Sequence, residues 1–247
     1  MKKEEDVFRQ FHDSFSQLEG HFHILEQRVP VKVQMEYFKC SEEIRKQVSP
    51  DSLTEEKVNS LFDLLEIPDS SVKEKKHLLT TLAISKSVKA YRLLEDYVRH
   101  PDDRLVDWAY MALMESRISL ESEFSNEKQI YISTGLGGKE GRLRFYVLFI
   151  AKDRLPFQEY QCRVIEREFP YQLSHADCEI ERLTIKTNHV EMIFLVPVRA
   201  DIKGILDKVI SECNQYGDFL ANMFTITNVK ELSESEVADI ISQDGND

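Results

Sequence analysis

Residues 142–152 have the sequence RLRFYVLFIAK, which contains one of the two longest apolar runs of the chain, Phe145–Ala151. A short continuous apolar run bounded by charged residues is typical of a strand that is buried on both faces. We therefore expect a central β-strand here. The pattern of the residues that follow predicts a helix, two strands joined by a turn, a second helix and a last strand, over residues 156–169, 179–187, 190–198, 201–210 and 219–229.

The resulting order of elements from Arg142, β-α-β-β-α-β, resembles the split β-α-β arrangement of ferredoxin-like folds. One extra strand, Gln129–Thr134, is expected before it and is joined to Arg142–Lys152 by a glycine-rich hairpin loop. The resemblance implies a ferredoxin-like α+β domain over residues 127–230. A different α+β sandwich is the open alternative.

The first part of the chain, residues 1–126, has the period of helices instead. Large apolar residues recur every three or four positions from Phe8 to Leu25, which predicts an amphipathic helix over that stretch. Pro30 ends or bends this helix. Further helices are expected over residues 33–48, 54–65 and 72–117, the last interrupted near residues 85 and 101.

Within residues 72–117, the turn Pro101-Asp102-Asp103 opens into Arg104-Leu105-Val106 and is followed by Ala109 and Ala112-Leu113. Paired helices joined by a short Pro-Asp turn that leads into Arg-x-Val resemble a HEAT-type repeat. The resemblance implies that residues 1–126 form an all-α HEAT-like bundle, which presents a concave surface to a protein partner. The chain is therefore expected to be α+β, with this helical domain followed by the ferredoxin-like one.

The composition limits the classes of function. The chain has 247 residues, of which 42% are hydrophobic and 31% charged, an ordinary globular balance with room for two domains. The net charge of −12 excludes binding of nucleic acid through a generally basic surface, but it leaves room for a local basic patch. No apolar run follows the charged residues at the start of the chain, as a secretory signal would require, and apolar runs of at most seven residues are too short for a membrane helix. Together with four scattered cysteines, this predicts a cytoplasmic protein without a membrane partner.

The glycine-rich loop is the most unusual local feature, because four of the eight glycines lie within residues 135–141. Glycine lets backbone amides approach a phosphate closely. However, Lys139 is followed by Glu140 instead of Ser or Thr, and the loop leads into a strand instead of a helix, so neither a P-loop nor a dinucleotide fingerprint is present. The plainer interpretation is a mobile hairpin without a ligand. The functional interpretation is a basic finger that contacts an anionic partner through Gly135, Gly137, Gly138, Lys139, Arg142 and Arg144.

No catalytic residue is predicted, because the sequence has no GxSxG, no HExxH and no cysteine with a local catalytic signature. Cys162, His175 and Cys178 are candidates for a zinc site only in principle, since no fourth ligand accompanies them. We therefore expect no resident metal and no cofactor, and we expect that the protein is not an enzyme.

Two residues of the helical domain are candidates for protein interaction. Trp108, the only tryptophan, lies at the margin of the apolar stripe of its helix. It either packs inside the protein or anchors a partner, since tryptophan is enriched in binding hot spots. Arg104 is expected on the outer side of its turn. The C-terminal segment 231–247 holds six acidic residues and no basic one, and Ser233 is a suitable cap for a short helix there.

These observations favour a non-catalytic adaptor that binds a protein partner through the helical-repeat surface. An RNA- or ribosome-associated factor that uses the basic hairpin 135–144 is the first alternative. A small-ligand sensor of ferredoxin-like type is the second, and only the analogy of fold supports it. The sequence does not indicate an oligomeric state.

Overall fold

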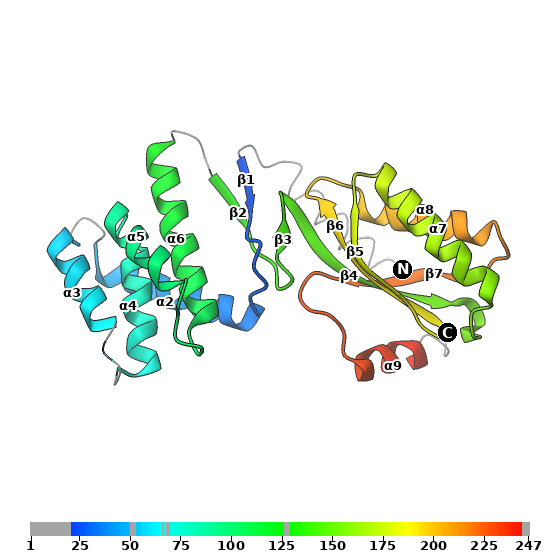
Figure 1. Cartoon of the computed structure of the whole chain (residues 1–247), viewed down its shortest axis with the longest axis horizontal. Helices are drawn as coiled ribbons and strands as arrows, with labels where there is room; N and C mark the ends of the chain where they lie inside the picture. The colour runs from blue at the N-terminus through cyan, green and yellow to red at the C-terminus, as the bar shows by residue number, and fades with distance from the viewer. Residues whose placement is uncertain (1–20, 50–52, 66, 68–69, 126–128, 244–247) are drawn as a thin grey trace. The chain divides into compact units, whose positions relative to one another are not determined.

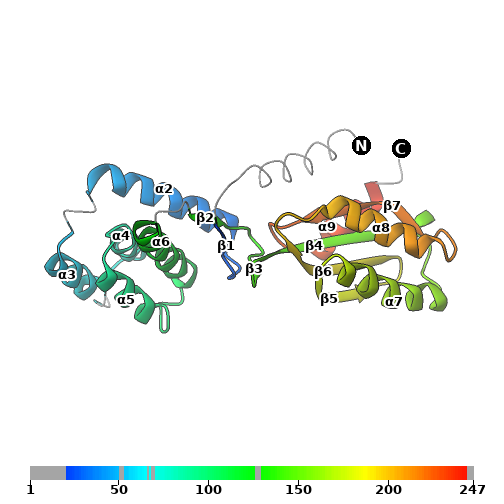
Figure 2. The same ribbon diagram turned by 90° about the horizontal axis from the view of Figure 1, so that it is seen from above.

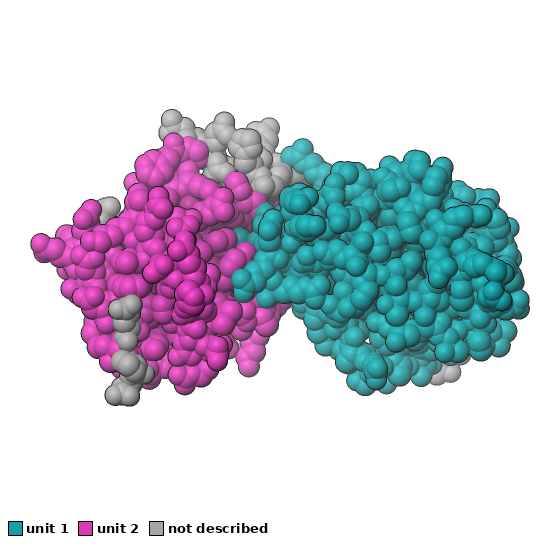
Figure 3. Space-filling view, in the orientation of Figure 1, with its two compact units in different colours: residues 1–19, 24–28, 133–247 teal, residues 20–23, 29–132 magenta. Residues whose placement is uncertain are grey.

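The computed structural model describes residues 21–49, 53–65, 67, 70–125 and 129–243, and these form a mixed α+β protein. The chain divides into two compact units (Figure 3). The sheet unit contains residues 24–28 and 133–243 of the described chain, and the helical unit contains residues 21–23 and those between 29 and 132. Each unit has its own core.

The sheet unit is built around β4 (Arg142–Ala151), which is antiparallel to all of its neighbours (Figure 1). β6 (His189–Pro197) pairs with it along almost its whole length, and β5 (Glu179–Ile185) pairs with β6. β7 (Leu220–Thr227) pairs with the second half of β4, and β3 (Gly138–Lys139) pairs with its first two residues. The long strands therefore have the order β7-β4-β6-β5, with β4 and β6 in the centre.

Different helices cover the two faces of this sheet (Figure 1). Phe149 of β4 faces α7 (Glu159–His175), where its ring meets that of Phe169 edge to face at 5.0 Å between centres. α8 (Ile202–Asn214) packs beside α7. Leu148 and Ile150, which point to the opposite face, form an apolar cluster with Val237 of α9 (Glu234–Gln243). The alternation of side chains along β4 thus gives one strand two buried faces.

The helical unit contains five helices among its described residues: α2 (Val31–Gln47), α3 (Glu55–Leu65), α4 (Val72–Ala83), α5 (Val88–Tyr97) and α6 (Val106–Phe124) (Figure 2). A capping box begins α4, in which the Ser71 hydroxyl accepts the N–H of Glu74 and the Glu74 carboxylate accepts the N–H of Ser71. Leu94 and Ala109 are fully buried where α5 and α6 pack together. None of the described helices is both long and apolar enough to cross a membrane.

Two expectations about elements were wrong. Residues 8–20 of the expected first helix lie outside the described residues, but its end is the strand β1 (His21–Ile24), which pairs with β2 (Gln129–Ile132). The sequence His-Phe-His-Ile suits a strand as well as a helix, so the helical period was extended too far. The extra strand before Arg142 exists as β2, but the hairpin partner of β4 is β3 instead.

Candidate functional site

The glycine-rich loop uses its backbone amides within the protein. The N–H of Leu136 donates to the carbonyl of Asn228 at 2.9 Å, and the N–H of Gly138 donates to the carbonyl of Glu26 at 3.3 Å. The N–H of Glu140 donates to the carboxylate of Glu26 at 3.1 Å. Amides that already have acceptors are not available to bind a phosphate.

The glycines of this loop are explained by close contacts between backbone segments. Gly137 has a φ of +66°, and a Cβ atom there would lie 2.3 Å from the carbonyl oxygen of Glu26. A Cβ atom at Gly135 would lie 1.8 Å from the carbonyl oxygen of Val229. Only glycine fits these two positions. The concentration of glycine therefore reflects how the loop packs on residues 24–28 and on the segment after β7.

The basic side chains of the hairpin are paired with acidic ones from β5 and the residues before it. Arg142 contacts Asp177 at 2.8 Å. Arg144 donates to the Glu181 carboxylate at 2.8 Å and to the carbonyl of Leu136 at 2.7 Å. The hydrogen bond from Arg144 lowers the pKa of Glu181, which keeps the pair charged.

These ion pairs weaken the interpretation of the hairpin as a basic finger. Arg144 is only 9% exposed, so little of its side chain is accessible to an anionic partner. Lys139 is about half exposed and lies 3.8 Å from Glu179. Because the neighbouring acids neutralise much of the local positive charge, the hairpin offers little net attraction to an anionic partner.

Trp108 lies inside the helical unit, with 4% of its surface exposed. Its indole N–H donates to the carbonyl of Lys76 at 3.1 Å and to the hydroxyl of Thr80 at 3.0 Å, both in α4. Its ring meets that of Tyr37 edge to face, with 5.2 Å between the centres. Trp108 therefore connects α6 to α4 and packs against Tyr37 of α2.

The buried side of α2 is largely polar, and the Glu115 carboxylate of α6 accepts hydrogen bonds from two of its hydroxyl groups. The Tyr37 and Ser41 hydroxyls each donate to the Glu115 carboxylate at 2.5 Å. Arg45 adds an ion pair to the same carboxylate at 2.9 Å. Burial and the nearby Glu115 raise the pKa of Tyr37, so its phenol remains protonated. This network fixes how α2 is rotated about its axis.

The outer side of α2 carries two exposed apolar side chains among charged ones. Met35 is 67% exposed and Phe38, one turn further on, is 54% exposed. Lys39 and Glu42 are exposed beside them. We call Met35, Phe38, Lys39 and Glu42 the outer face of α2. The sequence signal for this face is the spacing of Met35 and Phe38 by three residues, which sets them apart from the inward-facing Tyr37.

Arg104 is exposed, as expected, but it does not extend freely into solvent. Its guanidinium contacts the Asp102 carboxylate at 3.1 Å, and its backbone N–H donates to the same side chain at 3.0 Å. The hydrogen bond to Asp102 raises the pKa of Arg104. Arg104 therefore stabilises its own turn, and it lies apart from the α2 contacts described above.

Within the described residues no three histidine, cysteine, aspartate or glutamate side chains are grouped closely enough to hold a metal ion. The four cysteines are free thiols, and burial raises the pKa of Cys178 to about 11, which disfavours the reactive thiolate. No protein-family model matches the chain, and no curated protein is significantly similar to it in sequence. The function must therefore be argued from the geometry of the chain itself.

Proposed function

We propose that the protein is a non-catalytic adaptor that binds a protein partner through the outer face of α2. The observation that carries this proposal is the position of Met35 and Phe38, which are exposed on a helix whose buried side is largely polar. Methionine and aromatic side chains are enriched where proteins bind each other, and two of them one turn apart form a small apolar patch. The partner contributes aliphatic or aromatic side chains, with charges that complement Lys39 and Glu42.

The contacts on the inner side of α2 support the same proposal. Glu115 holds the inner side of the helix, and Trp108 packs against Tyr37 beneath it. A helix held in this way does not need to be ordered when a partner binds, so less entropy is lost. In this proposal Trp108 is a support for the interface and not its anchor.

We also infer the fold families of the two units. The Pro-Asp turn before α6, stabilised by Asp102 and Arg104, and the packing of α4, α5 and α6 support a short HEAT-like bundle. In the sheet unit, the chain order β4-α7-β5-β6-α8-β7 and the strand order β7-β4-β6-β5 support a ferredoxin-like fold. The cytoplasmic location remains a prediction from the sequence.

The RNA-binding alternative has less support from the structure than from the sequence. Arg142 and Arg144 are paired with acidic side chains, and the amides of the loop have acceptors. A protein that binds RNA needs unpaired cations or exposed aromatic rings at the interface. We therefore retain this alternative only as an outcome of the experiment below.

The proposal is tested by affinity capture with the tagged full-length chain from extracts of its own cells, with and without nuclease. The test variant carries Met35→Ala and Phe38→Ala. The control carries Val88→Ala and Val106→Ala, which remove two other exposed apolar side chains of the helical unit. We expect the same partner protein with the wild type and the control, and a loss of about tenfold or more with the test variant.

Two results would overturn the proposal. If the test variant captures as much partner as the wild type, the outer face of α2 is not the binding surface. If nuclease releases the captured proteins, the chain binds them through RNA. A partner that passes both tests is then purified, and its dissociation constants for the three forms of the chain are measured.

A further inference from the structure

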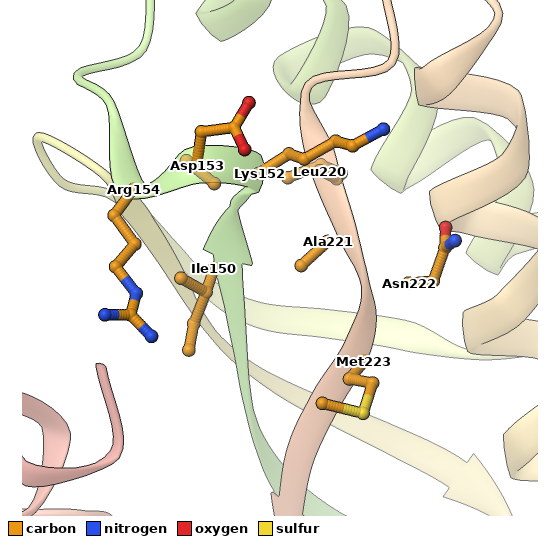
Figure 4. A pocket seen from close by; sticks show the side chains of 9 residues that line it. Ile150, Lys152, Asp153, Arg154, Leu220, Ala221, Asn222 and Met223 are labelled. Carbon is orange, nitrogen blue, oxygen red and sulfur yellow. The ribbon is translucent and has the colours of Figure 1, made fainter. Parts of the chain in front are cut away.

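An open cleft in the sheet unit lies beside the ends of β4 and β7 (Figure 4). Its volume is about 490 Å³, which is within the range of sites for small molecules. Its lining is Ile150, Ala151, Lys152, Asp153, Arg154, Leu220, Ala221, Asn222 and Met223. One part of this lining is apolar, and the other part is a short turn with three consecutive charged residues.

The turn has an uncommon backbone conformation. Asp153 and Arg154 have φ angles of 60° and 57°, so two consecutive residues other than glycine are left-handed. Such a conformation costs energy and persists only where the surroundings hold it. Here the N–H of Lys152 donates to the carbonyl of Phe219 at 2.8 Å, which fixes the start of the turn to the residue before β7.

This backbone separates the three charged side chains. In Figure 4 the Asp153 carboxylate and the Arg154 guanidinium leave the turn in opposite directions, and Arg154 extends toward the level of Ile150. Lys152 points away from Arg154 and forms an ion pair with Asp218. The cation that remains beside the apolar lining is therefore Arg154.

Arg154 is the cation of the cleft that has no acidic partner among the described residues. Its side chain is partly buried, and it makes no ion pair or side-chain hydrogen bond with any described residue. By contrast, Arg142 and Arg144 of the same unit both pair with acids. A guanidinium that loses part of its hydration without a partner gains when a planar anion binds to it.

We propose that this cleft binds a small amphipathic carboxylate. The carboxylate pairs with the Arg154 guanidinium through two parallel hydrogen bonds, and the apolar body of the ligand lies against Ile150, Ala221 and Met223. A single negative charge suits the site better than a phosphate dianion, because Asp153 lies in the same turn and Lys152 is already paired. This site lies in the sheet unit and does not depend on the adaptor function proposed for the helical unit.

The binding test uses four probes with the same eight-carbon chain: octanoate, octyl phosphate, octanol and octylamine. Methyl NMR signals of Ile150 and Met223 in the full-length chain report binding at the cleft. We expect octanoate to shift both signals in a saturable way and to bind more tightly than the other three probes. Tighter binding of octyl phosphate would overturn the carboxylate assignment, and equal binding of octanol would show that Arg154 contributes nothing. Failure of octanoate to bind in the millimolar range would overturn the site itself.

Variants of Arg154 test the role of the guanidinium. Arg154→Gln removes the charge and should weaken octanoate binding by about tenfold or more, whereas Arg154→Lys should retain part of the affinity. Arg163→Gln is the matched control, because Arg163 is an exposed arginine of the same unit that does not line the cleft. Circular dichroism and the melting temperature establish that each variant is folded. Unchanged affinity in folded Arg154→Gln would contradict the proposal.

Discussion

The strand β4 and the helix α2 bury their side chains by different means. In β4, nine consecutive residues from Leu143 to Ala151 are buried, and most of them are apolar. In α2 the buried side chains include Gln34, Tyr37 and Ser41, while Met35 is exposed. The hydrophobic effect accounts for the position of β4, whereas α2 depends also on hydrogen bonds to Glu115.

This difference separates apolar side chains that serve folding from those that are candidates for function. An apolar side chain in β4 is explained by the core around it. Met35 and Phe38 have no such explanation, because α2 is already held by its polar side. Exposed apolar side chains that do not serve folding are candidates for binding.

The largest expected effect is on β4. Phe149→Ala removes a fully buried ring that packs on Phe169, and it should lower the free energy of unfolding of the sheet unit by about 3–5 kcal/mol. Urea unfolding followed by far-UV circular dichroism measures this loss. The fluorescence of Trp108, the only tryptophan, reports the helical unit separately. A loss below about 1 kcal/mol would contradict the packing described for the sheet.

The next effect is on the polar side of α2. Glu115→Ala leaves the Tyr37 and Ser41 hydroxyls without their acceptor and should destabilise the helical unit by about 2–3 kcal/mol. Trp108 fluorescence during urea unfolding measures this change, since Tyr37 packs on the indole. Glu42→Ala, which breaks only an exposed pair with Lys46, is the control and should change stability by less than about 0.5 kcal/mol. Equal effects of both variants would mean that the network does not hold α2.

A smaller effect concerns pH in the sheet unit. The hydrogen bond from Arg144 lowers the pKa of Glu181 in the folded protein, so this pair stabilises the fold above the ordinary glutamate pKa of about 4.3. The stabilisation is lost as the pH falls from there through the lowered pKa. Between pH 6 and pH 3 the free energy of unfolding should fall in both proteins. We expect this decrease to be about 1 kcal/mol smaller for Glu181→Gln than for the wild type. Urea unfolding at several pH values measures the difference.

The control for this experiment is Glu159→Gln, which alters a highly exposed carboxylate of the same unit. Its loss of stability in acid should equal that of the wild type. If Glu181→Gln also loses as much as the wild type, the Arg144–Glu181 pair does not contribute to the stability of the fold.

The smallest effect is expected at the hairpin. Lys139→Ala removes a half-exposed side chain that lies 3.8 Å from Glu179, and it should change the unfolding free energy by less than about 0.5 kcal/mol. Thermal unfolding followed by circular dichroism is sufficient for this comparison. A loss of more than about 1.5 kcal/mol would contradict the description of Lys139 as a weakly paired surface side chain.

Much of the order of elements could be predicted from the sequence. The apolar run of β4 reflects burial on both faces of the strand. The helical period of apolar residues in α5 and α6, which includes the buried Leu94 and Ala109, also reflects burial. The pairing of β3 with β4, and of β1 with β2, was not predictable in this way. Short strands carry little pattern, and which strands pair depends on contacts between distant residues.

The candidate sites were harder to predict for related reasons. The charges of Arg142 and Arg144 are visible in the sequence, but their pairing with residues 177–181 depends on the position of β5 beside β6. Trp108 could be singled out by its residue type alone. Only the structure shows that its side chain is buried inside the helical unit. The left-handed turn at Arg154 has no glycine to indicate it, so the cleft leaves no signal in the sequence.

One measurement tests the central claim, that the outer face of α2 binds a partner and the basic hairpin does not. Phe38 in one form of the full-length chain, and Lys139 in another, are replaced by the photo-crosslinker p-benzoylphenylalanine, and both forms are irradiated in cells. The account predicts a protein cross-link from position 38 that nuclease does not remove, and none from position 139. A cross-link from position 139 alone, to protein or RNA, would contradict it.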